Sequence, residues 1–281
     1  MPPRVNGLIA ALEKGDVAFG AWLQNGDFSA ARRAGDSSAD FVIVDMEHTG
    51  FGFTELGHTL QWLISRRTSH LRPAPASPIV RTPVTAEDRA AWVHKQTLDY
   101  GAMGLLLAQA SRPEDVREVV RSMRYPRPED DGPPGRRGAL PGTAMRYLGW
   151  DSHEEYFARA DLWPLNPHGE LMLVLLVESL QAWQNIDELV AEPGVGAVLW
   201  GPGDGLVSLG IHTFDVADPV LDPYRAAVVA SCKAAGIPVG NPAATDLQRA
   251  IDEGFDFIST PDWNEARVTE ARAYASARRK G

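Results

Sequence analysis

The sequence predicts a (β/α)8 barrel, and two observations support this fold class. Eight short runs of β-favouring apolar residues recur along the 281 residues, and helix-like segments separate most of them. Several runs are apolar at every position, which is typical of parallel strands covered on both faces. Eight such strands alternating with helices in a chain of this length favour a barrel, with a doubly wound open sheet as the alternative.

The expected elements follow in chain order. The strands are expected at 18–23 (AFGAWL), 40–46 (DFVIVDM), 78–82 (PIVRT), 103–108 (MGLLLA), 171–177 (LMLVLLV), 196–200 (GAVLW), 236–240 (GIPVG) and 255–260 (FDFIST). Helix-end signals lie between them. Thr85 is a good N-cap, and Pro113 stands where the first turn of a helix tolerates proline. Gly236 and Gly254 are placed as the glycines that end helices.

One stretch interrupts the alternation. Residues from about 126 to 168 begin with a Pro- and Gly-rich part that excludes a regular element. The second part holds the bulky side chains Tyr147, Trp150, Tyr156, Phe157 and Trp163, too many for a disordered linker. We therefore expect one barrel domain over residues 1–281 with an ordered insertion at about 126–168. This insertion forms either a lid or acceptor pocket, or a surface subdomain or oligomer contact.

Composition limits the partners. The formal net charge is -10 and the isoelectric point is about 5.2. This charge argues against nucleic acid and against an anionic membrane surface as partners. No stretch has the ~18–20 apolar residues of a membrane span. The single cysteine, Cys232, cannot form an intramolecular disulfide and is expected to be a buried small hydrophobe. We expect a soluble cytoplasmic protein.

Polar residues gather where the expected strands end, which is where barrel enzymes place their catalytic groups. The polar strand-end residues are Asp45, Glu47 and His48 after the second strand, Arg81 on the third, Glu178 after the fifth and Asp204 after the sixth. Two carboxylates, completed by water, suit Mg²⁺ or Mn²⁺, so Glu178 and Asp204 are the candidate metal ligands. Alternatively, these acids cap helices. Trp22, near the end of the first strand, is a candidate substrate contact.

Three further features have two interpretations each. An imidazole side chain can act as a base near neutral pH, so His48 is a candidate general base, or else a hydrogen-bonded structural histidine. The loop GPGDG (201–205) is not a dinucleotide fingerprint, but its backbone N–H groups could bind a carboxylate or phosphate. The arginines of GRRG (135–138) form either an exposed basic turn or an anion-contacting loop.

Taken together, these segments resemble a known family. The segments DFVIVDMEHTGFG (40–52), PIVRTP (78–83), LDYGAMGLLLAQASRPEDVREVVRSMRYP (98–126), GRRG and VESLQAWQNIDELVAEPGVGAVLWGPGDGLVSLG (177–210) occur in this order. They resemble the HpcH/HpaI family of metal-dependent class II pyruvate aldolases. The resemblance implies a modified (β/α)8 barrel whose last helix is swapped between subunits. It also implies a homo-oligomer, usually a hexamer built as a trimer of dimers.

The resemblance also assigns roles by motif. Glu178 and Asp204 would bind a divalent metal, Mg²⁺, Mn²⁺ or Co²⁺, and Arg81 would contact the keto oxygen. The N–H groups of Gly203 and Asp204 would hold the substrate carboxylate. His48 would be the base, and Asp99 would reach the His48 of a neighbouring subunit. Asp45 and Glu47 would orient His48 and the metal's waters.

The implied reaction cleaves or forms a 4-hydroxy-2-keto acid through a pyruvate- or hydroxypyruvate-type enolate, with an aldehyde as second partner. The resemblance also implies a role in aromatic compound catabolism. One departure is Leu176, which stands two residues before Glu178 where the family often has Gln. This position is expected to contact substrate. The departure keeps open a decarboxylase or another non-aldol carbon–carbon lyase or synthase on the same scaffold. A non-catalytic barrel is the remaining alternative.

Overall fold

The computed structural model describes residues 3–65, 76–128 and 132–280, and its strands form a closed barrel. The strands are β1 (Ala18–Gln24), β2 (Phe41–Asp45), β3 (Ser77–Thr85), β4 (Gly104–Ala108), β5 (Leu162–Trp163), β6 (Leu171–Val177), β7 (Ala197–Trp200), β8 (Val239–Asn241) and β9 (Phe257–Thr260). Pairing runs β4-β3-β2-β1-β9-β8-β7-β6, and a β4–β6 pairing closes the ring. All pairs are parallel, so the predicted (β/α)8 barrel is confirmed.

Each expected strand is present, and two details differ from the sequence prediction. The two-residue strand β5 was not expected; it pairs beside the start of β6. The run 236–240 becomes strand only at Val239, because Gly236 takes a left-handed conformation (φ 69°) and ends the preceding helix.

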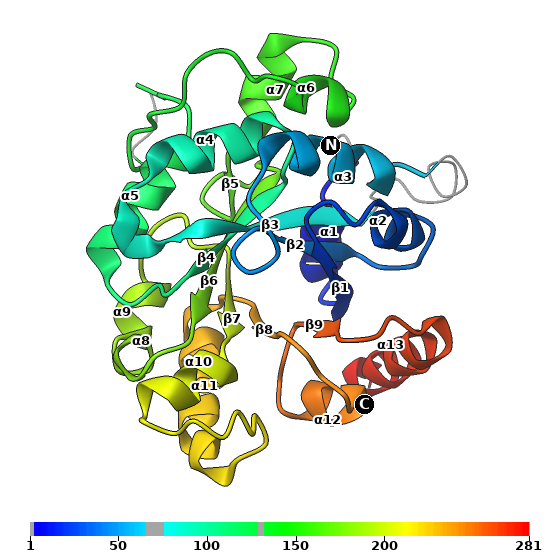
Figure 1. Cartoon of the computed structure of the whole chain (residues 1–281), viewed down its shortest axis with the longest axis vertical. Coiled ribbons are helices and arrows are strands. Elements are labelled where there is room, and N and C mark those ends of the chain that lie inside the picture. Colours follow the sequence, from blue (N-terminus) through cyan, green and yellow to red (C-terminus); the bar gives the residue numbers. More distant parts are fainter. Residues whose placement is uncertain (1–2, 66–75, 129–131, 281) are drawn as a thin grey trace.

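Helices surround the barrel (Figure 1). They are α1 (Gly7–Glu13), α2 (Phe28–Gly35), α3 (Phe53–Leu63), α4 (Ala91–Asp99), α5 (Pro113–Met123), α6 (Ala144–Tyr147), α7 (His153–Arg159), α8 (Leu180–Gln184), α9 (Ile186–Val190), α10 (Pro202–Ser208), α11 (Asp222–Ala235), α12 (Leu247–Asp252) and α13 (Glu265–Lys280), with 3-10 turns η1 (Ala86–Asp88) and η2 (Pro219–Leu221). Thr85 caps η1 in a capping box with Asp88, and Pro113 opens α5, as predicted.

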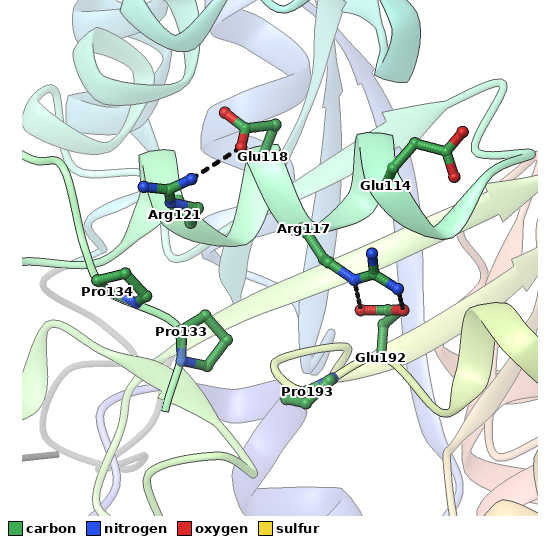
Figure 2. Close-up of a pocket in the computed structure, with 8 residues that line it drawn as sticks. All are labelled: Glu114, Arg117, Glu118, Arg121, Pro133, Pro134, Glu192 and Pro193. Carbon is green, nitrogen blue, oxygen red and sulfur yellow. Dashed lines mark hydrogen bonds and ion pairs between the residues drawn. The ribbon is translucent and has the colours of Figure 1, made fainter. Parts of the chain in front are cut away.

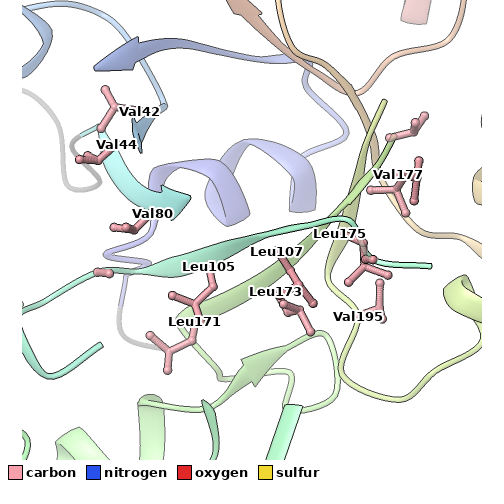
Figure 3. Close-up of a cluster of buried hydrophobic side chains, with 14 of the residues drawn as sticks. Val42, Val44, Val80, Leu105, Leu107, Leu171, Leu173, Leu175, Val177 and Val195 are labelled. Atoms are coloured by element: carbon pink, nitrogen blue, oxygen red, sulfur yellow. The ribbon is translucent and has the colours of Figure 1, made fainter. Parts of the chain in front are cut away.

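Alternate residues of each strand belong to two different cores. Leu105 and Leu107 of β4 and Leu173 and Leu175 of β6 pack between the strands and the surrounding helices (Figure 3). The intervening Leu106 joins the core inside the barrel. Because both faces of every strand are covered, the strands need apolar residues at every position. Each fully buried Leu or Val side chain stabilises the fold by about 1.5–3 kcal/mol.

Helix α1 closes the amino-terminal end of the barrel. Its Leu8 and Ile9 are buried in the inner core with Phe41 and Phe257, which start β2 and β9. Asn6 caps the helix by accepting from the Ile9 N–H. With this end plugged, the carboxyl ends of the strands form the open end of the barrel.

The insertion is ordered in its described parts and lies away from the open end. Its α6 and α7 sit at the edge of the molecule near α4 (Figure 1). Trp150 and Tyr156 are buried against each other, with ring centroids 5.5 Å apart. Trp163 donates to Glu13 of α1, at the plugged end. Within this chain the aromatic side chains therefore build a surface subdomain, one of the two arrangements expected, and do not cover the open end.

The last helix packs on its own chain in this single subunit. Val268 and Ala271 of α13 are buried, and Arg272 pairs with Asp40 ahead of β2 at 2.6 Å. The exchange of this helix between subunits stays a prediction. Among the described residues, none of the helices has the length and apolar character needed to cross a membrane. Cys232 is fully buried in α11, as expected.

Candidate active site

Strands β2 and β3 bring an ion-paired cluster to the open end. Asp45 and Arg81 are register partners in adjacent strands. The Arg81 Nε and Nη2 each lie 2.9 Å from one oxygen of Asp45, and Nη1 lies 3.2 Å from Glu47 Oε2. This two-point contact fixes the guanidinium plane. Because two carboxylates surround one guanidinium, the cluster keeps a net negative charge.

Trp22 and His48 flank this cluster. The Arg81 guanidinium lies over the Trp22 ring, 4.8 Å from its centroid, and the Trp22 Nε1 donates to the Pro242 carbonyl at 2.7 Å. Trp22 is thus a rigid wall beside Arg81. His48 is 62% exposed, and its Nε2 is 3.5 Å from Glu47 Oε2. The exposed imidazole is free to exchange protons with a substrate or with solvent.

Glu47 and His48 lie just beyond β2, which ends at Asp45. The Asp45 carboxylate accepts from the backbone N–H of Glu47 at 3.0 Å, so it also shapes the turn that carries both residues. Partial burial raises the pKa of Glu47, as do the charges of Asp45 and Asp204, while Arg81 and His48 oppose the shift.

Glu178 is a buried carboxylate with another acid beside it. It is 5% exposed, and its Oε1 accepts from the backbone N–H of Gln109 at 2.8 Å. Burial raises the pKa of Glu178 to about 8, and the neighbouring charges of Asp204 and Glu47 act in the same direction. The structure therefore brings the predicted pair Glu178 and Asp204 together, with Glu47 close by.

The donor set fits a hard divalent cation. Among the residues that the structure describes, no group of three or more His, Cys, Asp or Glu side chains is arranged to hold a metal. Mg²⁺ needs fewer protein ligands, because it is commonly held by one or two carboxylates plus waters and substrate oxygens. A cation would also relieve the repulsion that raises the pKa of Glu178. Glu178 and Asp204 therefore fit the predicted metal pair.

Helix α10 starts beside this pair. Gly203 and Asp204 lie in its first turn, where backbone N–H groups have no partner within the helix. These groups can therefore bind a carboxylate, as the GPGDG loop suggested. Leu176 is 4% exposed and belongs to the core inside the barrel. It gives the interior below Glu178 an apolar wall.

Asp99 lies apart from the other predicted residues within this chain. It ends α4, and helices of a barrel run back toward the amino-terminal ends of the strands. The buried Arg137 donates to Asp99 at 2.7 Å, and burial raises the pKa of Asp99. GRRG is the expected exposed turn only in part, since Arg136 is exposed and pairs with Glu118, whereas Arg137 is buried and pairs with Asp99.

The sequence did not single out two residues that shape the Glu178 site. Gly201 has no room for a side chain, because a Cβ there would lie 2.4 Å from the Glu178 Cβ. Its place at the start of the glycine-rich GPGDG loop was the only signal. Gln109 donates to Glu178 from a backbone with positive φ (51°). No sequence pattern predicts this conformation, because glutamine rarely adopts it.

A surface pocket of about 490 Å³ lies on the outer side of α5, away from these residues (Figure 2). Both arginines that line it are paired with glutamates. Arg117 contacts Glu192 at 2.6 Å, and Arg121 contacts Glu118 at 3.0 Å. None of the predicted site residues lines this pocket, so it does not compete with the barrel mouth as the site of chemistry.

Known proteins match this chain over most of its length. It is 32% identical over 257 residues to the hydroxypyruvate/pyruvate aldolase of Chromohalobacter salexigens, covering 89% of this chain and 88% of the relative. It is 31% identical over 252 residues to the 2-keto-3-deoxy-L-rhamnonate aldolase of Klebsiella pneumoniae, covering 88% of this chain and 84% of that relative. A crystal structure of an HpcH/HpaI aldolase/citrate lyase family protein from Burkholderia cenocepacia superposes with a TM-score of 0.74 at 27% identity, covering 98% and 99% of the two chains.

The profile of one family matches residues 18–260, which spans β1 to the end of β9 and every residue of the candidate site. The resemblance inferred from the motifs is therefore confirmed. This chain belongs to the HpcH/HpaI aldolase/citrate lyase family.

Proposed function

We propose that this protein is a metal-dependent class II aldolase that cleaves or forms 4-hydroxy-2-keto acids through a pyruvate- or hydroxypyruvate-type enolate. The observation that carries the proposal is the convergence of Glu178, Asp204 and the Arg81 cluster at one end of the barrel. Relatives named as hydroxypyruvate/pyruvate and 2-keto-3-deoxy acid aldolases support this reaction class.

Glu178 and Asp204 would hold the cation, which is Mg²⁺, Mn²⁺ or Co²⁺. When bound, a divalent cation supplies Lewis-acid stabilisation of negative charge on the keto oxygen. The first-turn N–H groups of Gly203 and Asp204 bind the carboxylate of the keto acid. Binding both ends of the substrate in this way fixes the orientation of its reactive carbon.

Arg81 places a fixed positive charge where the enolate oxygen develops. Its pairing with Asp45 and its position over Trp22 keep the guanidinium oriented before substrate arrives. In the cleavage direction, His48 removes the proton of the 4-hydroxyl group while the bond between C3 and C4 breaks. The electron pair of that bond passes into the enolate, and the aldehyde leaves. His48 then gives its proton to C3, which yields the keto acid, and the reverse of this step exchanges the C3 protons with solvent.

Isotope exchange tests this proposal. Purified protein is incubated in D₂O with Mg²⁺ or Co²⁺ and either pyruvate or hydroxypyruvate, and deuterium uptake is followed by mass spectrometry. We expect metal-dependent uptake that His48→Ala abolishes and that His58→Ala, an exposed histidine on α3, leaves unchanged. Absence of both exchange and cleavage of any 4-hydroxy-2-keto acid would refute the aldolase.

Leu176 favours one alternative. Its apolar wall below Glu178 removes a hydrogen bond that an amide would offer there. A decarboxylase or other non-aldol carbon–carbon lyase acting on a 2-keto acid is therefore the second candidate. It predicts release of CO₂ from oxaloacetate without aldol cleavage, which a coupled assay on the same preparation distinguishes.

We also propose that the chain works as a homo-oligomer, in line with a hexamer. Phe51 is 50% exposed and Trp92 is 57% exposed, and their rings pack 6.4 Å apart beside the loop that carries His48. An exposed aromatic surface of this kind is typical of subunit contacts. In the assembly, Asp99 of a neighbouring copy would meet His48.

Sedimentation tests the assembly. Trp92→Glu places a charge on the aromatic surface and is expected to dissociate the oligomer. Val216→Glu, at a residue 47% exposed in the loop before α11, serves as the matched control and should leave the mass unchanged. A monomeric parent protein at micromolar concentration would contradict the assembly.

A further inference from the structure

Gln109 has a strained backbone at the edge of the candidate site. Among the described residues, Arg89, Gln109 and Phe214 are non-glycine residues with positive φ, and Gln109 has φ 51°. A residue with a Cβ is disfavoured in this region, so the surrounding structure has to hold it there. Gln109 directly follows β4, at the carboxyl ends of the strands.

The strained conformation has an identifiable use. Ala108 and Ala110 on either side are fully buried, one in the core inside the barrel and the other in the core outside it. Between them, the backbone turns so that the Gln109 N–H donates to Glu178 Oε1 at 2.8 Å. A glycine would make the same turn without strain. The backbone role alone therefore does not account for glutamine at this position.

The side chain supplies what glycine lacks. Gln109 is exposed, and its position after β4 places it at the open end of the barrel. A keto acid that shares a cation with Glu178 would lie close to Gln109, because the Gln109 backbone N–H donates to that carboxylate. A primary amide can both donate to and accept from a hydroxyl group, whereas it has no comparable interaction with a methyl group.

We propose that Gln109 determines substrate specificity, with its side-chain amide hydrogen-bonding a hydroxyl group on the keto acid next to Glu178. The site would then discriminate hydroxypyruvate-type from pyruvate-type keto acids. This inference deepens the proposed function and rests on it. Leu176, on the barrel side of the same carboxylate, offers no such hydrogen bond.

Titration calorimetry on the Mg²⁺-loaded protein measures the affinities for hydroxypyruvate and pyruvate without requiring turnover. In Gln109→Leu, the ratio of the two affinities should shift against hydroxypyruvate by roughly three- to tenfold, which one neutral hydrogen bond provides. Gln24→Leu is the matched control, since Gln24 is also exposed at a strand end but on β1. The ratio of the hydroxypyruvate and pyruvate affinities in Gln24→Leu should equal that of the parent protein.

Gln109→Gly separates specificity from folding. It keeps the turn and the N–H donor, so we expect the same shift in the affinity ratio and a urea unfolding midpoint no lower than the parent's. The proposal would be overturned if both Gln109 variants kept the affinity ratio of the parent protein, including the case in which they bind both ligands equally more weakly. If the affinity ratio shifts but the protein shows neither deuterium uptake nor cleavage, the specificity role of Gln109 is retained and only the proposed aldol reaction is refuted.

Discussion

Replacing Glu178 with Gln should stabilise the metal-free protein at neutral and alkaline pH. The carboxylate is buried beside Asp204, which raises its pKa from 4.5 to about 8. Between these values, the folded chain retains a proton that the unfolded chain releases. The folded state therefore binds more protons, and the free energy of unfolding falls as the pH rises through this window.

The size of the effect follows from the two pKa values. At about 1.4 kcal/mol per pKa unit, the Glu178 carboxyl destabilises the metal-free fold by about 3 kcal/mol at pH 7 and by about 5 kcal/mol at pH 9. At pH 5 the effect is below about 1 kcal/mol. The Glu178→Gln variant would keep a side-chain oxygen for the Gln109 N–H and would carry no charge there at any of these pH values.

Urea unfolding in the presence of a chelator measures this difference at pH 5, 7 and 9. We expect the variant and the parent to diverge steadily with rising pH, with the variant more stable. Glu188→Gln, which alters an exposed carboxylate on α9, should follow the parent. Added Mg²⁺ should stabilise the parent and leave Glu178→Gln unchanged. Parallel pH profiles for the parent and Glu178→Gln would refute the reasoning.

Three further predictions concern other parts of the chain. Arg81→Lys loses the two-point contact with Asp45, so deuterium uptake should fall on the order of 10²–10³-fold; a loss below tenfold would contradict the role of Arg81. His94 is buried, and its pKa is lowered from 6.5 to about 4. Between pH values of about 4 and 6.5, the folded state therefore binds fewer protons than the unfolded state. Stability should fall as the pH drops through that window, by about 3 kcal/mol at pH 4, and urea unfolding of His94→Gln should lack this slope. Gly201→Ala would push the new Cβ against Glu178. Urea unfolding should therefore show a loss of about 1–3 kcal/mol in the free energy of unfolding, and calorimetry should show weaker Mg²⁺ binding. Gly138→Ala, where a Cβ meets nothing within 4 Å, should change neither.

The barrel itself could be predicted from the sequence because its signal is local. Fully covered strands require apolar residues at every position, and runs such as LMLVLLV satisfy that requirement without reference to any partner. Helix ends were also local, because Pro113 and Gly236 fit the backbone conformations that the ends require. The short strand β5 was missed because two residues carry no periodicity.

The candidate site was predictable in its residue types and strand positions, since Asp45, Arg81 and Glu178 all follow or end such runs. Sequence alone could not decide which charges neutralise each other. Tertiary structure decided that Arg81 pairs with Asp45, that Arg137 belongs to Asp99, and that the aromatic insertion packs away from the open end. It also decided the left-handed turn at Gln109. Strand and helix propensities act between neighbours in the chain, whereas ion pairing and burial depend on residues that only the closed barrel brings together.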